Sequence, residues 1–113
     1  MTFDETKFEF YEIISVDDLI PGERIFIDVD DMTIVLFNIA GDIYALEDRC
    51  SHDDGPLGEG DLEGFEISCP RHGARFDVRD GKALTLPAIE AVQYFPTRVV
   101  EGQIEIGFPV TEK

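Results

Sequence analysis

Both cysteines and both histidines of this 113-residue chain fall into two short pairs, and this pairing constrains the fold more than any other feature. Cys50-Ser51-His52 is the first pair and Cys69-Pro70-Arg71-His72 is the second, with sixteen residues between His52 and Cys69. Glycine and proline follow or interrupt each pair, which predicts that both lie on turns. Two turns that each present a thiolate and an imidazole can hold a metal centre between them. We therefore expect a fold that brings these two turns together.

The two pairs allow three other interpretations. Buried cysteines with unrelated surface histidines are common in proteins, but scattered positions would not fall into two tight pairs. A disulfide between Cys50 and Cys69 would leave the histidines unexplained. A structural zinc site of the Cys2His2 type is the main competitor, although zinc fingers usually pair cysteine with cysteine and histidine with histidine. A metal centre held by Cys50, His52, Cys69 and His72 is the preferred hypothesis.

The rest of the chain has the pattern of short antiparallel strands, which predicts an all-β fold. Apolar and polar residues alternate over 23–29, and a β-branched and aromatic run covers 32–39. Ala40-Gly41-Asp42 predicts a tight hairpin into a strand over 43–46. Pro96 predicts an edge position or a bulge for the run that contains it. Further strands are expected at 11–14, 65–69, 75–78, 92–100 and 103–108, with one helical turn capped by Ser15.

Residues 48–64 lack any periodicity and are rich in glycine, proline and acidic residues, which predicts a loop of 17 residues. A loop of that length inside a compact domain is usually functional or disordered. Its glycines do not follow the Gly-x-Gly-x-x-Gly spacing of dinucleotide-binding turns, and no βαβ pattern surrounds them. We interpret Gly55, Gly58, Gly60 and Gly64 as a source of loop flexibility.

The charge balance excludes several partners. Twenty-five acidic and nine basic residues give a formal net charge of -16, which argues against nucleic acid and against an anionic membrane surface. The first residues, MTFDETKFEF, do not resemble a secretory or transit peptide, and no run approaches the roughly 18 apolar residues of a spanning helix. A cytoplasmic protein is expected.

The spacing of the two pairs resembles the pattern of Rieske 2Fe-2S proteins. The resemblance extends to Gly55-Pro56-Leu57, to Gly73 and to Leu86-Pro87-Ala88, the last of which is similar to the loop that covers the cluster. It implies one domain over 1–113, built of small antiparallel sheets, with a cluster-binding subdomain at about 48–88. It also implies that Cys50 and Cys69 bind one iron as thiolates, that His52 and His72 bind the other as neutral imidazoles, and that two sulfides bridge the irons.

Within the Rieske family, this chain is similar to the soluble ferredoxins. Respiratory Rieske proteins have a disulfide between the cluster loops, but both cysteines here are assigned as ligands. Oxygenase terminal subunits need two further histidines for a mononuclear iron, and this chain has none left. The resemblance therefore implies a monomeric one-electron carrier that forms transient complexes with a flavin-dependent reductase and a terminal oxygenase. The alternatives are a small Rieske subunit of a nitrite-reductase-like complex and, from another class, a zinc-stabilised binding module.

Three details refine this hypothesis. The basic residues Arg49, Arg71, Arg75, Arg79 and Lys82 gather around the cluster loops, where pairing with Asp53, Asp54, Asp77 and Asp80 is favoured over a basic docking patch. An apolar rim of Leu57, Pro56, Pro70 and Pro87 is expected to exclude water and meet a partner. High-potential Rieske centres have serine and tyrosine where this chain has Ala74 and Phe76, so their sulfur-bound hydroxyls are missing. A potential near the bottom of the Rieske range, about -150 mV, is expected.

Overall fold

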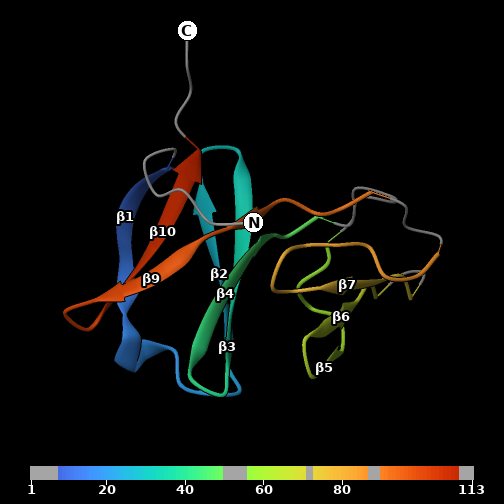
Figure 1. The fold of residues 1–113 in the computed structure, drawn as a ribbon, viewed down its shortest axis with the longest axis horizontal. Coiled ribbons are helices and arrows are strands. Elements are labelled where there is room, and N and C mark those ends of the chain that lie inside the picture. Colours follow the sequence, from blue (N-terminus) through green and yellow to red (C-terminus); the bar gives the residue numbers. More distant parts are fainter. Residues whose placement is uncertain (1–7, 50–55, 71–72, 87–89, 110–113) are drawn as a thin grey trace, which may run out of the picture.

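The architecture is seen in a computed structural model that describes residues 8–49, 56–70, 73–86 and 90–109. Three antiparallel sheets are present in this part of the chain (Figure 1). Their orders are β1-β10-β9, β2-β3-β4-β8 and β5-β6-β7. We call the first two the basal sheets and the third the distal sheet. The strands are β1 (Phe8–Ser15), β2 (Arg24–Val29), β3 (Met32–Ile39), β4 (Asp42–Glu47), β5 (Leu62–Glu63), β6 (Glu66–Ser68), β7 (Arg75–Asp77), β8 (Tyr94–Phe95), β9 (Thr97–Val100) and β10 (Gln103–Pro109).

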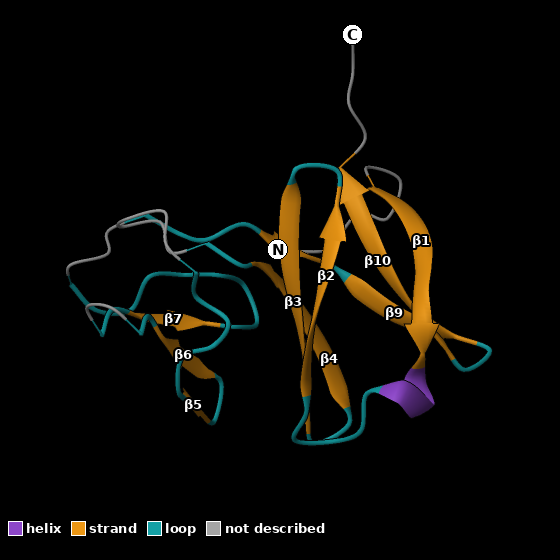
Figure 2. Ribbon diagram, turned by 180° about the vertical axis from the view of Figure 1, so that it is seen from behind, coloured by secondary structure: helices purple, strands orange, loops and turns teal. Residues whose placement is uncertain are grey.

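The all-β fold expected from the sequence is confirmed, and the distal sheet lies to one side of the basal sheets in both ribbon views (Figures 1 and 2). The single helical element among the described residues is a 3-10 turn, η2 (Val16–Asp18). As predicted, Ser15 caps it, because its hydroxyl accepts a hydrogen bond of 3.2 Å from the Asp17 amide. No helix in the described ranges has the length and apolarity needed to cross a membrane.

Two-residue turns set the register of the basal hairpins. Strands β2 and β3 pair from Val29 and Met32 outward, and Asp30 between them has a φ of 54°. Ala40 and Gly41 join β3 to β4 with φ values of 56° and 98°, which confirms the predicted tight hairpin. Positive φ values at these turns match the right-handed twist of the strands that they join.

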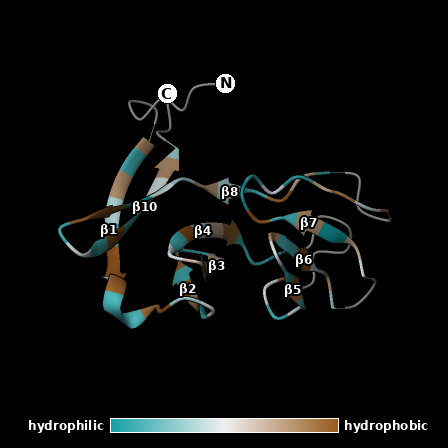
Figure 3. Cartoon of the chain, turned by 60° about the horizontal axis from the view of Figure 1, so that its bottom comes forward, coloured by the Kyte–Doolittle hydropathy of each residue, from teal (hydrophilic) through white to brown (hydrophobic). Residues whose placement is uncertain are grey.

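Strand β3 separates two hydrophobic cores. Ile34 and Leu36 face the core between the basal sheets, whereas Val35 and Phe37 face the core shared with the distal sheet. A strand buried on both faces needs a continuous apolar run, which is what residues 32–39 provide. Figure 3 colours much of β4, beside β3 in the middle of the molecule, as hydrophobic. The distal core also contains Leu46, Leu57, Ile67, Cys69, Ala74, Phe76, Val78 and Val92.

Several predicted boundaries were wrong in instructive ways. The run 92–100 is not one strand, because it divides at Pro96 into β8 and β9, which lie at edges of different basal sheets. Proline has no amide hydrogen to donate to a neighbouring strand. Its carbonyl instead accepts a hydrogen bond of 2.8 Å from the Gly107 amide. The predicted loop 48–64 contains β5, and β1 begins three residues before the predicted strand at 11–14. The remaining strands lie within one residue of their predictions.

Candidate metal centre

Cys69 is the one predicted ligand that lies within the described residues. It directly follows β6, where the chain turns towards β7, and two backbone hydrogen bonds close this turn. The Cys69 amide donates to the Ala74 carbonyl at 2.7 Å, and the Gly73 amide donates to the Cys69 carbonyl at 2.9 Å. Gly73 has a φ of 75°, a conformation that glycine adopts without strain. A tight turn therefore holds the thiol at a fixed place at the end of the distal sheet.

The surroundings of Cys69 fit a thiolate ligand of an inorganic cluster. Cys69 is a free cysteine with 1 % of its surface exposed, yet it lines an open pocket of about 440 Å³. Gly60 and Gly73 line the same pocket, so backbone rather than side chains forms part of its wall. Cysteine thiolates are the common protein ligands of iron–sulfur clusters. The residues present thus fit the 2Fe-2S centre that the motif implies.

The other three predicted ligands, Cys50, His52 and His72, lie outside the described residues, as do Asp53, Asp54, Arg71 and Pro87. Their flanking residues are described and show where the two loops begin and end. Among the described side chains, no group of three or more histidine, cysteine, aspartate or glutamate residues is arranged to hold a metal ion. A four-ligand centre must therefore include residues beyond those described.

Hydrogen bonds of Asp48 join the two ends of the first predicted ligand loop. The Asp48 amide donates to the Thr33 carbonyl at 2.8 Å, so β3 holds the start of the loop. One oxygen of the Asp48 carboxylate accepts from the amides of Leu57 and Gly58 at 2.9 and 2.6 Å. Charge-assisted hydrogen bonds of this kind are stronger than neutral ones. The segment that carries Cys50 and His52 is therefore closed by one carboxylate.

The interpretation of the loop glycines as sources of flexibility was wrong for Gly58 and Gly60. Both are buried and in close contact with neighbouring elements. A Cβ on Gly58 would come within 2.7 Å of the Phe26 ring and 2.9 Å of the Val35 side chain, and one on Gly60 would overlap the Ser68 carbonyl oxygen. These glycines therefore permit a close approach of backbone to backbone and to side chains. Gly64, with a φ of 60° and open space around it, serves the β5–β6 turn.

The predicted apolar rim was wrong at Leu57. Its exposed fraction is 0 %, because it packs in the distal core rather than facing a partner. Pro56 and Pro70 are exposed as expected. Among the described residues, the large apolar side chain with the greatest exposure is Leu86, at 78 %. Motif position alone did not distinguish the two leucines, because each is next to a proline: Leu57 follows Pro56, and Leu86 precedes Pro87.

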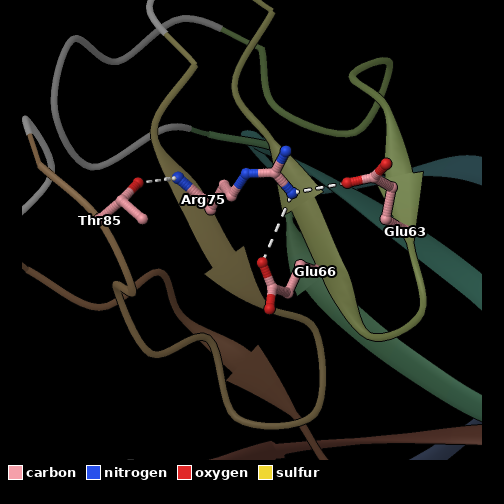
Figure 4. Close-up of polar contacts among 4 residues, drawn as sticks. All are labelled: Glu63, Glu66, Arg75 and Thr85. Carbon is pink, nitrogen blue, oxygen red and sulfur yellow. Dashed lines mark hydrogen bonds and ion pairs between the residues drawn. The ribbon is translucent and has the colours of Figure 1, made fainter.

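Arg75 joins three segments of the distal part through its side chain and backbone (Figure 4). Its guanidinium forms ion pairs with Glu63 at 3.0 Å and Glu66 at 3.5 Å, and its amide donates to the Thr85 hydroxyl at 2.9 Å. The hydrogen bond to Glu63 is the main reason that the pKa of Arg75 is raised. Glutamates on β5 and β6 are thus its partners, rather than the aspartates that the sequence suggested.

Arg79 confirms the predicted pairing with Asp77. Two side-chain hydrogen bonds of 3.0 and 2.8 Å join the guanidinium to both carboxylate oxygens. These side-chain hydrogen bonds are the main reason that the pKa of Asp77 is lowered and the pKa of Arg79 is raised. The same guanidinium lies 4.3 Å from the centre of the Phe65 ring. Pairing with nearby acids, as expected, accounts for Arg75 and Arg79 better than a dedicated docking patch does.

One basic residue far from the motif was missed by the sequence analysis. Arg24 on β2 donates through one nitrogen to the carbonyls of Gly58 and Gly60, at 2.5 and 2.7 Å. Its guanidinium also lies 5.5 Å from the centre of the Phe37 ring. A signal was present, because Arg24 is the one basic residue between Lys7 and Arg49 in an acid-rich stretch. The guanidinium presents several donors in a rigid fork, which suits it to bonds with fixed oxygen acceptors.

Comparison with known proteins agrees with this geometry. The family model described as the Rieske [2Fe-2S] domain matches residues 9–96. The 3-phenylpropionate/cinnamic acid dioxygenase ferredoxin subunit of Escherichia coli (strain K12) is 42 % identical over 95 residues, covering 83 % of this chain and 89 % of the relative. The ferredoxin component of the naphthalene 1,2-dioxygenase system of Pseudomonas putida is 33 % identical over 98 residues, covering 87 % and 94 %.

Solved structures give the same result. The ferredoxin of carbazole 1,9a-dioxygenase from Nocardioides aromaticivorans IC177 superposes with a TM-score of 0.79 at 30 % identity, over 86 % of this chain and 95 % of that one. A chain from the complex of reduced oxygenase and oxidized ferredoxin in carbazole 1,9a-dioxygenase superposes with a TM-score of 0.81 at 27 % identity, over 92 % and 97 %. Both the sequence and the fold are thus similar to dioxygenase ferredoxins.

Proposed function

Because this chain belongs to the Rieske [2Fe-2S] domain family and is an electron-transfer component rather than a catalytic subunit, we propose that it carries single electrons from a flavin-dependent reductase to a terminal oxygenase. The observation that carries the proposal is the buried Cys69 thiol, held by a tight turn and lining an open pocket. The similarity to named dioxygenase ferredoxins supports an oxygenase as the electron acceptor. A complex of oxygenase and ferredoxin is known for a protein of the same fold.

The proposed ligands are Cys50 and Cys69 on one iron, and His52 and His72 on the other. When bound, the cluster supplies reversible one-electron chemistry. The protein's part is to hold the two ligand loops at a fixed separation and to exclude water from the thiol side. Cys69 meets the second requirement, because the distal core packs around it. Neutral imidazole ligands raise the potential above that of an all-cysteine centre.

We further propose that residues 1–113 act as one Rieske domain, with residues 48–88 as its cluster-binding part. The protein is proposed to work in the cytoplasm as a monomer that forms transient complexes. Leu86 replaces Leu57 as the proposed apolar contact for redox partners, because it is exposed and belongs to the loop that resembles the cluster-covering loop. Leu86→Asp is expected to slow reduction by the reductase without changing the visible spectrum.

The two alternatives differ in their support. The family match favours an iron–sulfur centre over a zinc-stabilised module. The reported relatives are dioxygenase ferredoxins, which favours a free carrier over a small subunit of a nitrite-reductase-like complex. The purified protein is therefore expected to contain two irons and two acid-labile sulfides, and stoichiometric zinc without sulfide would overturn the proposal.

Redox titration tests the donor role. The potential is expected near -150 mV, because residues 74 and 76 offer no hydroxyl to the cluster sulfurs. Ala74 lies across the turn from Cys69, as the 2.7 Å hydrogen bond between their backbones shows. A new hydroxyl in Ala74→Ser or Phe76→Tyr should raise the potential by roughly 20–65 mV, the equivalent of one net hydrogen bond. A wild-type potential well above zero would contradict the donor role.

A further inference from the structure

Residues 57–60, which we call the seam segment, lie between the basal and distal sheets. On its basal side, Gly58 has so little space against Phe26 and Val35 that a Cβ would collide with both. On its distal side, Gly60 lies directly against the carbonyl of Ser68, the residue before Cys69. The Ser68 amide in turn donates to the Asp61 carbonyl at 2.9 Å. A movement of the seam segment is therefore transmitted to the backbone that precedes Cys69.

The seam segment is also continuous with the loop that carries Cys50 and His52. Asp48 closes that loop by accepting hydrogen bonds from the amides of Leu57 and Gly58, the first two residues of the seam segment. The position of the seam segment therefore sets where this loop rejoins the fold. One short segment thus lies between both pairs of proposed ligands.

The Arg24 side chain, on a basal strand, donates hydrogen bonds to two backbone carbonyls of the seam segment. The two acceptors, Gly58 and Gly60, are 34 and 36 residues away in sequence and belong to no regular ladder. A single guanidinium nitrogen donates to both, which fixes the spacing of the two carbonyls. The Phe37 ring lies 5.5 Å from the guanidinium and orients it.

We propose that Arg24 is a positioning residue for the cluster, acting through the seam segment on both ligand loops and not touching the cluster itself. This inference rests on the proposed function, since it assumes ligands at Cys50, His52, Cys69 and His72. Loss of the guanidinium releases the Gly58 and Gly60 carbonyls while the backbone ladder between β2 and β3 remains intact. The expected result is a cluster that is lost more easily from a protein whose basal sheets are little changed.

Arg98 provides a matched control on the other basal sheet. Like Arg24, it lies on a basal strand with its guanidinium near a phenylalanine ring, 4.0 Å from the centre of Phe10. Its Nε donates to Glu105 at 2.7 Å, so this bond joins β9 to β10 and does not involve the seam segment. Arg98→Gln removes the same kind of group and the bond between β9 and β10, and it keeps both bonds of Arg24 to the seam segment.

The experiment compares cluster-loaded wild type, Arg24→Gln, Arg24→Lys and Arg98→Gln. The rate of bleaching of visible absorption in excess iron chelator reports cluster loss, and the Tm reports global stability. Arg24→Gln is expected to lose its cluster at least tenfold faster than wild type, and Arg98→Gln within twofold of it. Arg24→Lys, which keeps the charge and donor hydrogens, should restore much of the stability. Removal of the fixed cation should also lower the potential of Arg24→Gln relative to Arg24→Lys.

The outcomes separate this inference from the function on which it rests. A wild-type protein without iron and sulfide would overturn the proposed function. If the wild type is loaded but Arg24→Gln and Arg98→Gln bleach at equal rates and have similar Tm values, the role of Arg24 is overturned and the proposed function stands. If Arg24→Gln retains no cluster on purification, Arg24→Lys decides: a cluster retained at unchanged Tm supports the role, and a cluster lost as completely as in Arg24→Gln contradicts it.

Discussion

The basal sheets and the distal sheet are stabilised by different means. The basal strands β1, β2, β3, β4 and β10 have six to eight residues each, with long ladders and two-residue turns. The distal strands have two or three residues each. The distal part depends instead on side chains that bond to backbone, such as Asp48, Arg24 and Thr85. From this comparison we expect the basal sheets to keep their fold without the cofactor and the distal sheet to depend on it.

Removal of one proposed cluster ligand should separate the two regions most clearly. Cys69→Ser is expected to lose the cluster, and amide exchange in the distal sheet and at residues 57–60 should then accelerate about 100-fold or more. The ladders of β2, β3 and β4 should keep their protection. Hydrogen exchange followed by mass spectrometry measures both regions in one sample. Equal acceleration in both would show that the base also depends on the cluster.

Close packing at Gly60 provides a second test of the distal part. In Gly60→Ala the new methyl group would overlap the Ser68 carbonyl, so backbone must shift, and a destabilisation of about 3 kcal/mol or more is expected. Gly64→Ala is the control, because Gly64 has open space and only the positive φ opposes a side chain, at about 1–2 kcal/mol. Denaturant unfolding gives both values. Similar losses of unfolding free energy in the two variants would mean that the backbone at residue 60 shifts readily to make room for the methyl group.

Leu57 and Leu86 test which leucine belongs to the core. Leu57→Ala removes a fully buried side chain from the distal core and should lower the free energy of unfolding by about 2–5 kcal/mol. Leu86→Ala alters an exposed side chain and should change it by less than about 0.5 kcal/mol. The same unfolding experiment distinguishes them. A large loss for Leu86→Ala would return that residue to the core.

The smallest effect expected is the pH dependence of the Asp77–Arg79 pair. Bonding to Arg79 lowers the pKa of Asp77 in the folded protein, so the pair contributes stability above about pH 4 and loses it as pH falls through the folded pKa. The Tm difference between wild type and Asp77→Asn should therefore be greatest near neutral pH. It should close below pH 4. A difference that persists in acid would assign it to packing rather than charge.

Sequence patterns predicted most of the basal strands and the distal strands β6 and β7, but not β5 or the division of the run 92–100 at Pro96. Alternation and turn residues predicted β2, β3 and the hairpin at Ala40-Gly41, because long ladders impose a regular pattern. The two-residue strand β5 leaves no such pattern within an acidic, glycine-rich segment. The roles of Gly58 and Gly60 depend on neighbours distant in sequence, Phe26, Val35 and Ser68. The proposed ligand pairs stand out in the sequence because metal chemistry restricts residue type and spacing. The partners of Arg24 are backbone carbonyls, which any residue could supply, so no sequence pattern marks them.

The most direct test of the proposed centre is pulsed electron paramagnetic resonance of the one-electron-reduced protein labelled with 15N-histidine. The chain has two histidines, so every labelled imidazole belongs to His52 or His72. The account predicts one unpaired electron per two irons and strong magnetic coupling to two 15N nuclei, one from each ligand ring. A reduced iron–sulfur signal without strong 15N coupling, or with coupling to a single ring, would contradict the assignment of both histidines to the cluster.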